Sequence, residues 1–181
     1  RRSLEEIRAF VGNGARELMR CALPAGTDEA VVESLLAEYL AWYAVNFCVK
    51  AAPYAGVKAV VDALIAKGVK VAVVSNKPHS AVTVLAKQYF GDIYARGEAP
   101  DCPRKPAPDM VKKAVAEMGV DTCVYVGDSE VDVLTAQNAE VPCVSVLWGF
   151  RDRETLQNAG GSIFCDRPEQ LAELLRREIR R

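Results

Sequence analysis

Two aspartates with a chemically suggestive spacing follow an apolar run in the second half of the sequence. The run 123–126 ends at Gly127, and Asp128 and Asp132 are four residues apart, so both can share one face of a helical turn. Carboxylates this close repel each other unless a cation joins them, and oxygen ligands without His or Cys suit Mg²⁺. The pattern predicts a magnesium site at Asp128 and Asp132. The alternative is a helix start, capped by Asp128, whose first turn favours acids.

Two further segments carry polar groups that could bind phosphate. Ser75 and Asn76 follow the apolar run 69–74 and precede an expected helix start, where a hydroxyl, an amide and free backbone N–H groups meet. The same residues can also form an ordinary turn and helix cap. Lys105 lies in the Pro-rich loop 98–108, where the stiff backbone could present its ammonium to a phosphate. A Lys-Pro pair in a solvated loop is common, so this signal is weak by itself.

The elements that must position these residues alternate along the chain. Hydrophobic periodicity, capping residues and glycines predict helices at 3–23 (two pieces joined by a glycine turn), 29–49, 57–66, 78–89, 108–118, 131–138, 153–158 and from 168 onward. Short apolar or β-branched runs predict strands at 69–74, 92–95, 123–126, 143–147 and 162–165. Strands separated by helices indicate an α/β fold with a parallel sheet, whose binding groups gather at the carboxyl ends of the strands. We expect a helical domain at 1–52 and a Rossmann-like domain at 53–181.

Composition narrows the class of protein. The 181 residues are 50% hydrophobic and 26% charged with a net charge of -1, which excludes a disordered chain and disfavours nucleic-acid binding. No apolar run approaches the roughly 18 residues of a membrane span. Six cysteines without a C-x-x-C pair, beside one His, exclude the usual zinc spacing and favour free thiols in a reducing, cytoplasmic compartment. We expect a soluble monomer or small homo-oligomer with no nucleic-acid or membrane partner.

The three polar segments together resemble, in order and spacing, the second, third and fourth motifs of the haloacid dehalogenase-like hydrolases. The resemblance covers the whole chain: residues 54–181 look like the Rossmann-like core of that family, and residues 1–50 look like the small helical cap of its phosphatases. Three finer stretches look most like the phosphoglycolate phosphatase branch. They are Val11-Gly12-Asn13-Gly14-Ala15-Arg16-Glu17-Leu18, Ser75-Asn76-Lys77-Pro78 and Trp148-Gly149-Phe150-Arg151.

The resemblance implies a Mg²⁺-dependent phosphomonoester hydrolase that acts through an aspartyl-phosphate, most plausibly on phosphoglycolate. It implies that Ser75, with a backbone N–H near Asn76, binds the phosphoryl oxygens, and that Lys105 stabilises their negative charge. Asp128 would ligate Mg²⁺, and Asp132 would be a second ligand or would hold Lys105.

The same resemblance makes residues 12–16 a substrate loop of the cap. Asn13 and Arg16 would read the leaving group, and Arg16 could pair with a carboxylate such as that of glycolate. The alternative is an ordinary exposed arginine on a helix. His79 matches no catalytic position and is expected on the surface of a helix's first turn.

The sequence departs from the family pattern in one important respect. The first motif, Asp-x-Asp-Gly-Thr, carries the nucleophilic and the acid/base aspartates, and no Asp-x-Asp occurs in this sequence. In the family this motif ends a central strand between those matching 69–74 and 123–126, so we expect a gap of about two strand spacings there and a longer parent protein. A smaller departure is Glu140, where the family usually has glycine.

Other functions stay open at this stage. One is hydrolysis of another small phosphorylated metabolite or of pyrophosphate, because cap residues set substrate choice. Another is a catalytically inactive binding or regulatory protein, which the missing nucleophile would permit. A flavodoxin-like binding module is a third, although such a module requires neither Lys105 nor Asp132.

Overall fold

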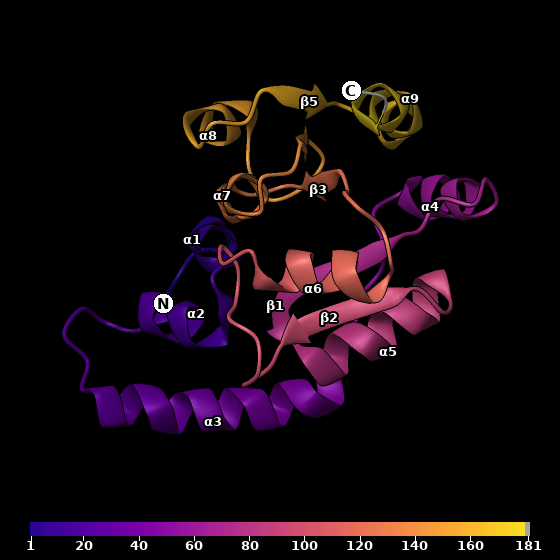
Figure 1. Ribbon diagram of the computed structural model, residues 1–181. Helices are drawn as coiled ribbons and strands as arrows, with labels where there is room; N and C mark the ends of the chain where they lie inside the picture. Colours follow the sequence, from indigo (N-terminus) through magenta and orange to yellow (C-terminus); the bar gives the residue numbers. More distant parts are fainter. Residues whose placement is uncertain (180–181) are drawn as a thin grey trace. The chain divides into compact units, whose positions relative to one another are not determined.

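The computed structural model describes residues 1–179, apart from the side chains at 176, 178 and 179, and the chain divides into two compact units (Figure 1). The first unit, Arg1–Ala51, is called the helical unit here, and the second, which begins at Ala52, is called the core unit. The boundary lies one residue before the expected one. No described helix is long and apolar enough to cross a membrane.

The helical unit contains three helices whose ends follow from local sequence. They are α1 (Leu4–Phe10), α2 (Gly14–Ala22) and α3 (Glu29–Asn46). Ser3 and Glu6 form a capping box at the start of α1, and Asp28 accepts a hydrogen bond from the Ala30 N–H at the start of α3. The turn between α1 and α2 uses Gly12 at φ 132° and Gly14 at φ 83°, a backbone region that other residues rarely adopt. The expected pair of short helices joined by a glycine turn is therefore confirmed.

The core unit alternates helices with parallel strands, as the sequence predicts. Its elements are α4 (Val57–Ile65), β1 (Ala72–Pro78), α5 (His79–Phe90), β2 (Tyr94–Glu98), α6 (Asp109–Glu117), β3 (Tyr125–Gly127), α7 (Glu130–Asn138), β4 (Cys143–Val146), α8 (Arg153–Asn158), β5 (Ile163–Cys165) and α9 (Pro168–Ile179). Every pair of neighbouring strands is parallel, so each crossover requires a helix. The α/β fold class is confirmed.

The strands form two separate sheets rather than one. One sheet has the order β1-β2 and the other has the order β3-β4-β5. Among the described residues, β1 and β3 do not pair, so each strand keeps one edge without a neighbour. Val126, in the middle of β3, is 38% exposed, which is unusual for a short strand of a parallel sheet. A sheet closed by direct pairing of β1 with β3 is thus excluded for the described residues.

The expected bounds of the first two strands were wrong, and the second, expected at 92–95, is Tyr94–Glu98. The apolar run predicts 69–74, whereas β1 runs from Ala72 to Pro78 and includes the polar residues that were read as a turn. Pairing with β2 explains the extension, because Pro78 lies opposite Glu98 after an irregularity in the register. Gly97 permits this approach: a Cβ at that position would meet the backbone of residues 77 and 79 within 3.0 Å.

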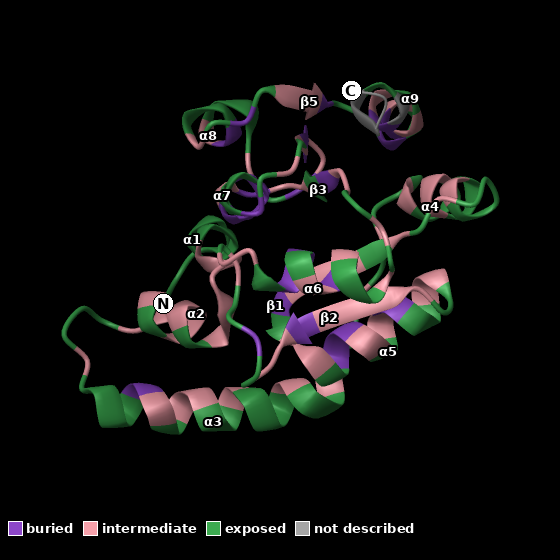
Figure 2. Cartoon of the chain, in the orientation of Figure 1, coloured by how far each residue is buried: buried purple, intermediate pink, exposed green. Residues whose placement is uncertain are grey.

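His79, the first residue of α5, lies differently from what the sequence suggests. It is half-buried rather than exposed, and its Nδ1 accepts a hydrogen bond from the Gly97 N–H at 3.2 Å. Its ring therefore ties the start of α5 to β2. Figure 2 shows that α5 carries exposed, half-buried and buried residues along its length.

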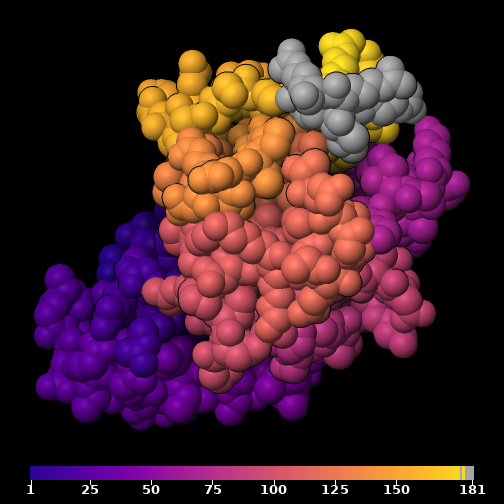
Figure 3. Space-filling model, in the orientation of Figure 1, coloured from indigo at the N-terminus to yellow at the C-terminus, as the bar shows by residue number. Residues whose placement is uncertain are grey.

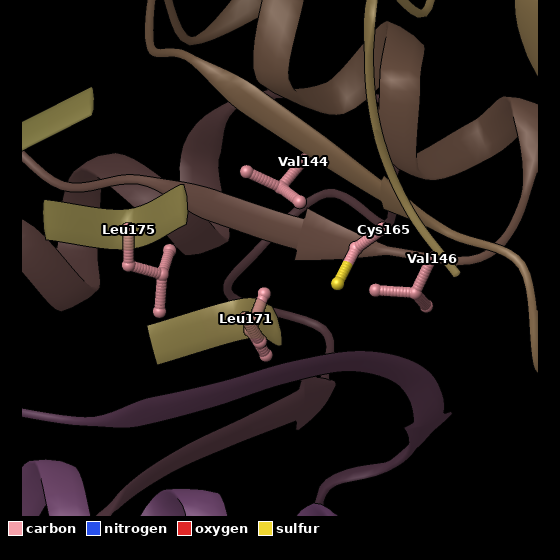
Figure 4. Close-up of a cluster of buried hydrophobic side chains, with 5 residues drawn as sticks. All are labelled: Val144, Val146, Cys165, Leu171 and Leu175. Carbon is pink, nitrogen blue, oxygen red and sulfur yellow. The ribbon is translucent and has the colours of Figure 1, made fainter. Parts of the chain in front are cut away.

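Two groups of buried apolar side chains hold the second sheet in place. One consists of Val144, Val146, Cys165, Leu171 and Leu175 and packs α9 on β4 and β5 (Figure 4). The other surrounds Tyr125 of β3 with α6 and α7 side chains, and Val74 of β1 packs against it. Because Val74 reaches this second group, the ends of β1 and β3 are anchored to one core. All six cysteines are free, in agreement with the expected thiols.

Candidate active site

Asp132, in the first turn of α7, is the most heavily hydrogen-bonded side chain at the end of β3. Its Oδ1 accepts from Lys105 Nζ at 2.7 Å and from the Tyr125 hydroxyl at 3.0 Å. Its Oδ2 accepts from the Ser129 hydroxyl at 2.7 Å and from the backbone N–H groups of Asp128 and Ser129, each at 3.1 Å. Five donors thus converge on one carboxylate that is only 6% exposed. A buried charge requires such compensation.

The electrostatics of this cluster follow from its burial. Burial alone raises the pKa of Asp132, but the Lys105 charge and the surrounding donors outweigh it and hold that pKa below its ordinary value. Burial and the neighbouring Asp132 charge raise the pKa of Tyr125 well above its ordinary value. The cluster therefore favours an ionised Asp132 beside a neutral Tyr125 phenol.

Asp128 lies next to this cluster and has fewer partners. Its Oδ2 accepts from the Phe150 N–H at 3.0 Å, and its own backbone N–H also stabilises the carboxylate. Burial, followed by the charge of Asp132, raises the pKa of Asp128. The pKa values of the two aspartates are thus shifted in opposite directions. Asp132 is stabilised as an anion by protein groups, whereas for Asp128 burial and the Asp132 charge outweigh the influence of Lys105.

Two glycines make room for these carboxylates. A Cβ at Gly127 would come within 3.0 Å of the Asp132 side chain, and a Cβ at Gly149 would collide with the Asp128 carboxylate. Real Cβ atoms essentially never approach so closely. Both glycines are therefore required by close packing against the acids rather than by a special backbone angle.

The backbone of Lys105 is held by an asparagine side chain from β1. Asn76 accepts from the Lys105 N–H through Oδ1 at 2.7 Å and donates to the Lys105 carbonyl through Nδ2 at 2.9 Å. The following peptide bond, to Pro106, is cis, and Asn138 of α7 donates to the Pro106 carbonyl at 2.9 Å. Both polar atoms of the Asn76 side chain are thus used to position Lys105.

In the space-filling view the orange segment around residues 125–150 packs directly on the salmon segment around residues 100–115 (Figure 3).

Ser75 precedes this asparagine in β1. Its Oγ accepts from the Lys77 N–H at 3.2 Å, which leaves the hydroxyl proton available as a donor. The structure therefore brings Asn76, Lys105, Asp128 and Asp132 into one connected network, and Ser75 adjoins it through the chain.

A loop after β4 closes over the Asp128 backbone. Arg151 donates its N–H to the Asp128 carbonyl at 3.2 Å, and its guanidinium forms two hydrogen bonds with Glu130, at 2.7 and 3.2 Å. Together with the Phe150 N–H, these contacts fix Asp128 from the side of β4. The stretch Trp148 to Arg151 was noted in the sequence only as a resemblance, without a role.

The two cap residues expected at the substrate lie in the helical unit. Arg16 of α2 forms an ion pair with Glu29 of α3 at 2.9 Å and another with Glu33. Asn13 is the residue before α2, and its side chain makes no capping hydrogen bond. Arg16 is thus paired with two glutamates of its own unit, and its role in binding the leaving group stays a prediction.

Sequence reasoning missed three groups of this network. They are the Tyr125 hydroxyl, the Ser129 hydroxyl and the Phe150 N–H, none of which the sequence singles out. Ser129 could have been found, because it lies three residues before Asp132 as in a capping box, and both capping hydrogen bonds form.

Comparison with known proteins decides the family. A sequence model of the haloacid dehalogenase-like hydrolases matches residues 1–140, more than half of the chain. The chain belongs to the haloacid dehalogenase-like hydrolase family. The three polar segments singled out in the sequence are linked by the hydrogen bonds described above, from Asn76 through Lys105 to Asp132.

Individual relatives in this family are phosphatases. Phosphoglycolate phosphatase from Rhodobacter capsulatus is 34% identical over 160 residues, covering 82% of this chain and 70% of that protein. The enzyme of that name from Xanthomonas campestris is 31% identical over 185 residues, covering 94% and 80%. A crystal structure of a candidate phosphoglycolate phosphatase from Lactobacillus delbrueckii superposes with a TM-score of 0.89 at 35% identity, covering 96% of this chain and 83% of that one. The enzyme class of this haloacid dehalogenase-like chain is thus phosphatase.

The carboxylates of this haloacid dehalogenase-like site can be compared with the ligands that Mg²⁺ requires. Within residues 1–179, no group of three or more His, Cys, Asp or Glu side chains gathers as a metal site. Mg²⁺ usually takes only one or two carboxylates and completes its octahedron with water and phosphate oxygens. The Asp128 carboxylate fits as one such ligand. Asp132, with five donors already on its two oxygens, fits better as the holder of Lys105.

Proposed function

We propose that the complete protein is a Mg²⁺-dependent phosphomonoesterase that acts through an aspartyl-phosphate, with phosphoglycolate as substrate. The observation that carries the proposal is the Lys105, Asp132 and Asp128 cluster: a buried ammonium paired with Asp132, beside a second carboxylate whose pKa is raised by burial and by the Asp132 charge. The names of the relatives support the substrate. Six free thiols support a cytoplasmic location.

Each described group has a task in the proposed reaction. Ser75, in the middle of β1, donates its hydroxyl proton to a phosphoryl oxygen. Lys105 places positive charge where negative charge accumulates during transfer, and Asp132 keeps it there. Asp128 holds Mg²⁺, which when bound neutralises phosphate charge and orients the phosphoryl group.

The attacking carboxylate must be supplied by another segment. We propose that it ends a strand lying between β1 and β3, because each of these strands has an edge without a neighbour among the described residues and Val126 of β3 is 38% exposed. Backbone N–H and C=O groups on such edges require partners. The expected separation of β1 and β3 is two strand spacings, about 9 to 10 Å. That carboxylate would form a bond to phosphorus as the ester oxygen leaves with a proton from a second aspartate, and water would then hydrolyse the acyl phosphate.

Substrate choice is assigned to the helical unit. Because Arg16 is paired with two glutamates, we propose Asn13 as the more available of the two cap residues for the leaving group. Asn13→Ala should lower turnover of phosphoglycolate more than turnover of p-nitrophenyl phosphate, whose leaving group offers few polar contacts. An equal loss on both esters would make Asn13 structural, and a preference for pyrophosphate or another small phosphate ester would replace the substrate proposed here.

The function as a whole is tested by phosphate release from the complete protein. We expect turnover of phosphoglycolate that requires Mg²⁺, is lost in Asp128→Asn and falls to a low but measurable rate in Lys105→Met, while circular dichroism shows both variants folded. Val84→Ala, on the exposed side of α5, serves as a control that should retain parent activity. A complete protein that binds phosphate esters without hydrolysing any of them would instead be a binding or regulatory homologue.

A further inference from the structure

The hydroxyl of Tyr125 lies between the two charged groups of the site. It is 3.0 Å from Asp132 Oδ1 and 3.1 Å from Lys105 Nζ, and the residue is 7% exposed. A tyrosine hydroxyl buried in a strand costs free energy unless it finds partners. A phenylalanine would fill the same space in the apolar group around β3 without that cost. The hydroxyl therefore needs a reason beyond packing.

The direction of each hydrogen bond follows from the chemistry of the groups. A carboxylate can only accept and an ammonium can only donate, so the Tyr125 proton goes to Asp132 and the Tyr125 oxygen accepts from Lys105. The three N–H groups of Lys105 are then accounted for: one bonds Asp132, one bonds Tyr125, and one has no partner among the described residues.

The position of Tyr125 is itself fixed. Its ring packs with Val111, Ala136 and Ala139, all buried, so the hydroxyl has little freedom to move. The Lys105 ammonium also lies 5.8 Å from the centre of the ring. With Asp132 alone, a flexible lysine could rotate about a single hydrogen bond, whereas two acceptors at different places define where its third N–H points.

We propose that Tyr125 is a positioning residue that fixes the Lys105 ammonium so that one N–H remains for the phosphoryl group. The proposal rests on the phosphatase function proposed above. It assigns to a strand residue the task of aiming the lysine, a task separate from balancing its charge. Asp132 does the latter.

Kinetics of the complete protein test this role. Tyr125→Phe should lower kcat by about 10-fold while KM changes by less than about twofold, because a misplaced charge weakens the transition state more than the ground state. Tyr94→Phe, which removes a hydroxyl from β2 without hydrogen bonds to Lys105 or Asp132, should leave kcat within about twofold of the parent. An unchanged kcat in folded Tyr125→Phe would overturn the proposal.

Combining Tyr125→Phe with Lys105→Met distinguishes a positioning role of Tyr125 from a merely structural one. In a Lys105→Met background, Tyr125→Phe should cause no further loss of kcat, because the group it aims is gone. A structural role predicts that the two losses multiply. Such a multiplicative loss would also overturn the proposal.

A spectroscopic measurement makes the result independent of turnover. In ¹⁵N-lysine-labelled complete protein, the Nζ proton signal of Lys105 should be observable in the parent and in Tyr94→Phe, and should disappear by solvent exchange in Tyr125→Phe. A Lys105 signal unaffected by Tyr125→Phe would contradict the positioning role. If the parent hydrolyses no phosphate ester but the Lys105 signal behaves as expected, the proposed phosphatase function is wrong. The inference that Tyr125 positions the Lys105 ammonium is then still supported.

Discussion

Two Lys–Asp ion pairs of the core unit have the same length and opposite surroundings. Lys58 and Asp62, one turn apart on α4, approach to 2.7 Å with side chains 57% and 52% exposed. Lys105 and Asp132 also approach to 2.7 Å, but their side chains are 11% and 8% exposed. Water screens the first pair and competes for both partners, whereas the second depends on protein groups for all of its solvation.

The difference in exposure determines how much stability is lost when one member of each ion pair is removed. An exposed pair on a helix contributes a few tenths of a kcal/mol and can be lost without consequence. A buried pair with four further donors on its carboxylate cannot lose one member without leaving an unpaired charge in a nearly dry site. Lys105 and Asp132 are therefore central to the structure between β1 and β3. Burying this ion pair has a desolvation cost that apolar side chains of similar volume would avoid.

Removing one carboxylate charge from each pair should separate them most clearly. Asp132→Asn should lower the free energy of unfolding by about 3–5 kcal/mol, since Lys105 is left buried and unpaired and an amide N–H₂ faces the Ser129 donors. The matched change Asp62→Asn should cost no more than about 0.5 kcal/mol. Urea denaturation of both variants measures this contrast. Equal costs would mean that Asp132 gains little from its burial.

Replacing Asp128 by asparagine should change the free energy of unfolding by a smaller amount and in the opposite direction. Its folded-state pKa is raised, by burial and then by Asp132, so ionising it costs stability as pH rises above the unfolded value of about 3.9. In chelator, Asp128→Asn should therefore be more stable than the parent at pH 7, by about 0.5 kcal/mol or more. The difference should vanish as pH falls below about 4. A variant less stable than the parent at pH 7 would show that the Asp128 charge is already balanced by the protein.

Asp132 has the reverse dependence on pH. Its folded-state pKa is lowered by Lys105 and the surrounding donors against the effect of burial, so its contribution is complete above the unfolded pKa and is lost as pH falls through the folded one. Acid titration of the parent should therefore show stability falling below about pH 4, and Asp132→Asn should lack this fall. Urea midpoints between pH 3 and 5 measure it.

The smallest expected effect is in the helical unit. Arg16 pairs with Glu29 while both side chains are about half exposed, so Arg16→Gln should change the free energy of unfolding by about 0.3 kcal/mol or less. Thermal denaturation of this variant beside the parent checks the value. A loss of more than about 1 kcal/mol would show that the Arg16 ion pair, like the Lys105 pair, is important for stability.

Much of the framework could be predicted from local sequence. The glycine turn at 12–14, the cap at Asp28 and the alternation of helices with apolar runs each have a short-range physical cause, and the corresponding elements form. Glu140 is a similar case: it occupies a position where the family has glycine, and it adopts φ 60°. The grouping of Lys105 with the two aspartates followed from a resemblance in motif order, because the residues are far apart in sequence.

The rest depends on long-range contacts that leave no local signal. Tyr125 looks like any strand aromatic until its hydroxyl is seen between Lys105 and Asp132. Asn76 was expected at the substrate, yet both polar atoms of its side chain bond the Lys105 backbone. The extension of β1 through polar residues depends on pairing with β2, a partner that periodicity within one segment cannot reveal.

The central claim is that this chain holds the phosphate-binding and charge-balancing half of a phosphatase site and needs an aspartate-bearing strand between β1 and β3 for turnover. It is tested most directly by measuring phosphate release from phosphoglycolate with Mg²⁺, using in parallel the complete protein and the 181-residue chain, each verified by intact mass. The account predicts turnover by the complete protein and none by the 181-residue chain, which lacks the attacking group. Phosphate release by the homogeneous 181-residue chain would contradict both the nucleophile assignment and the mechanism built on it.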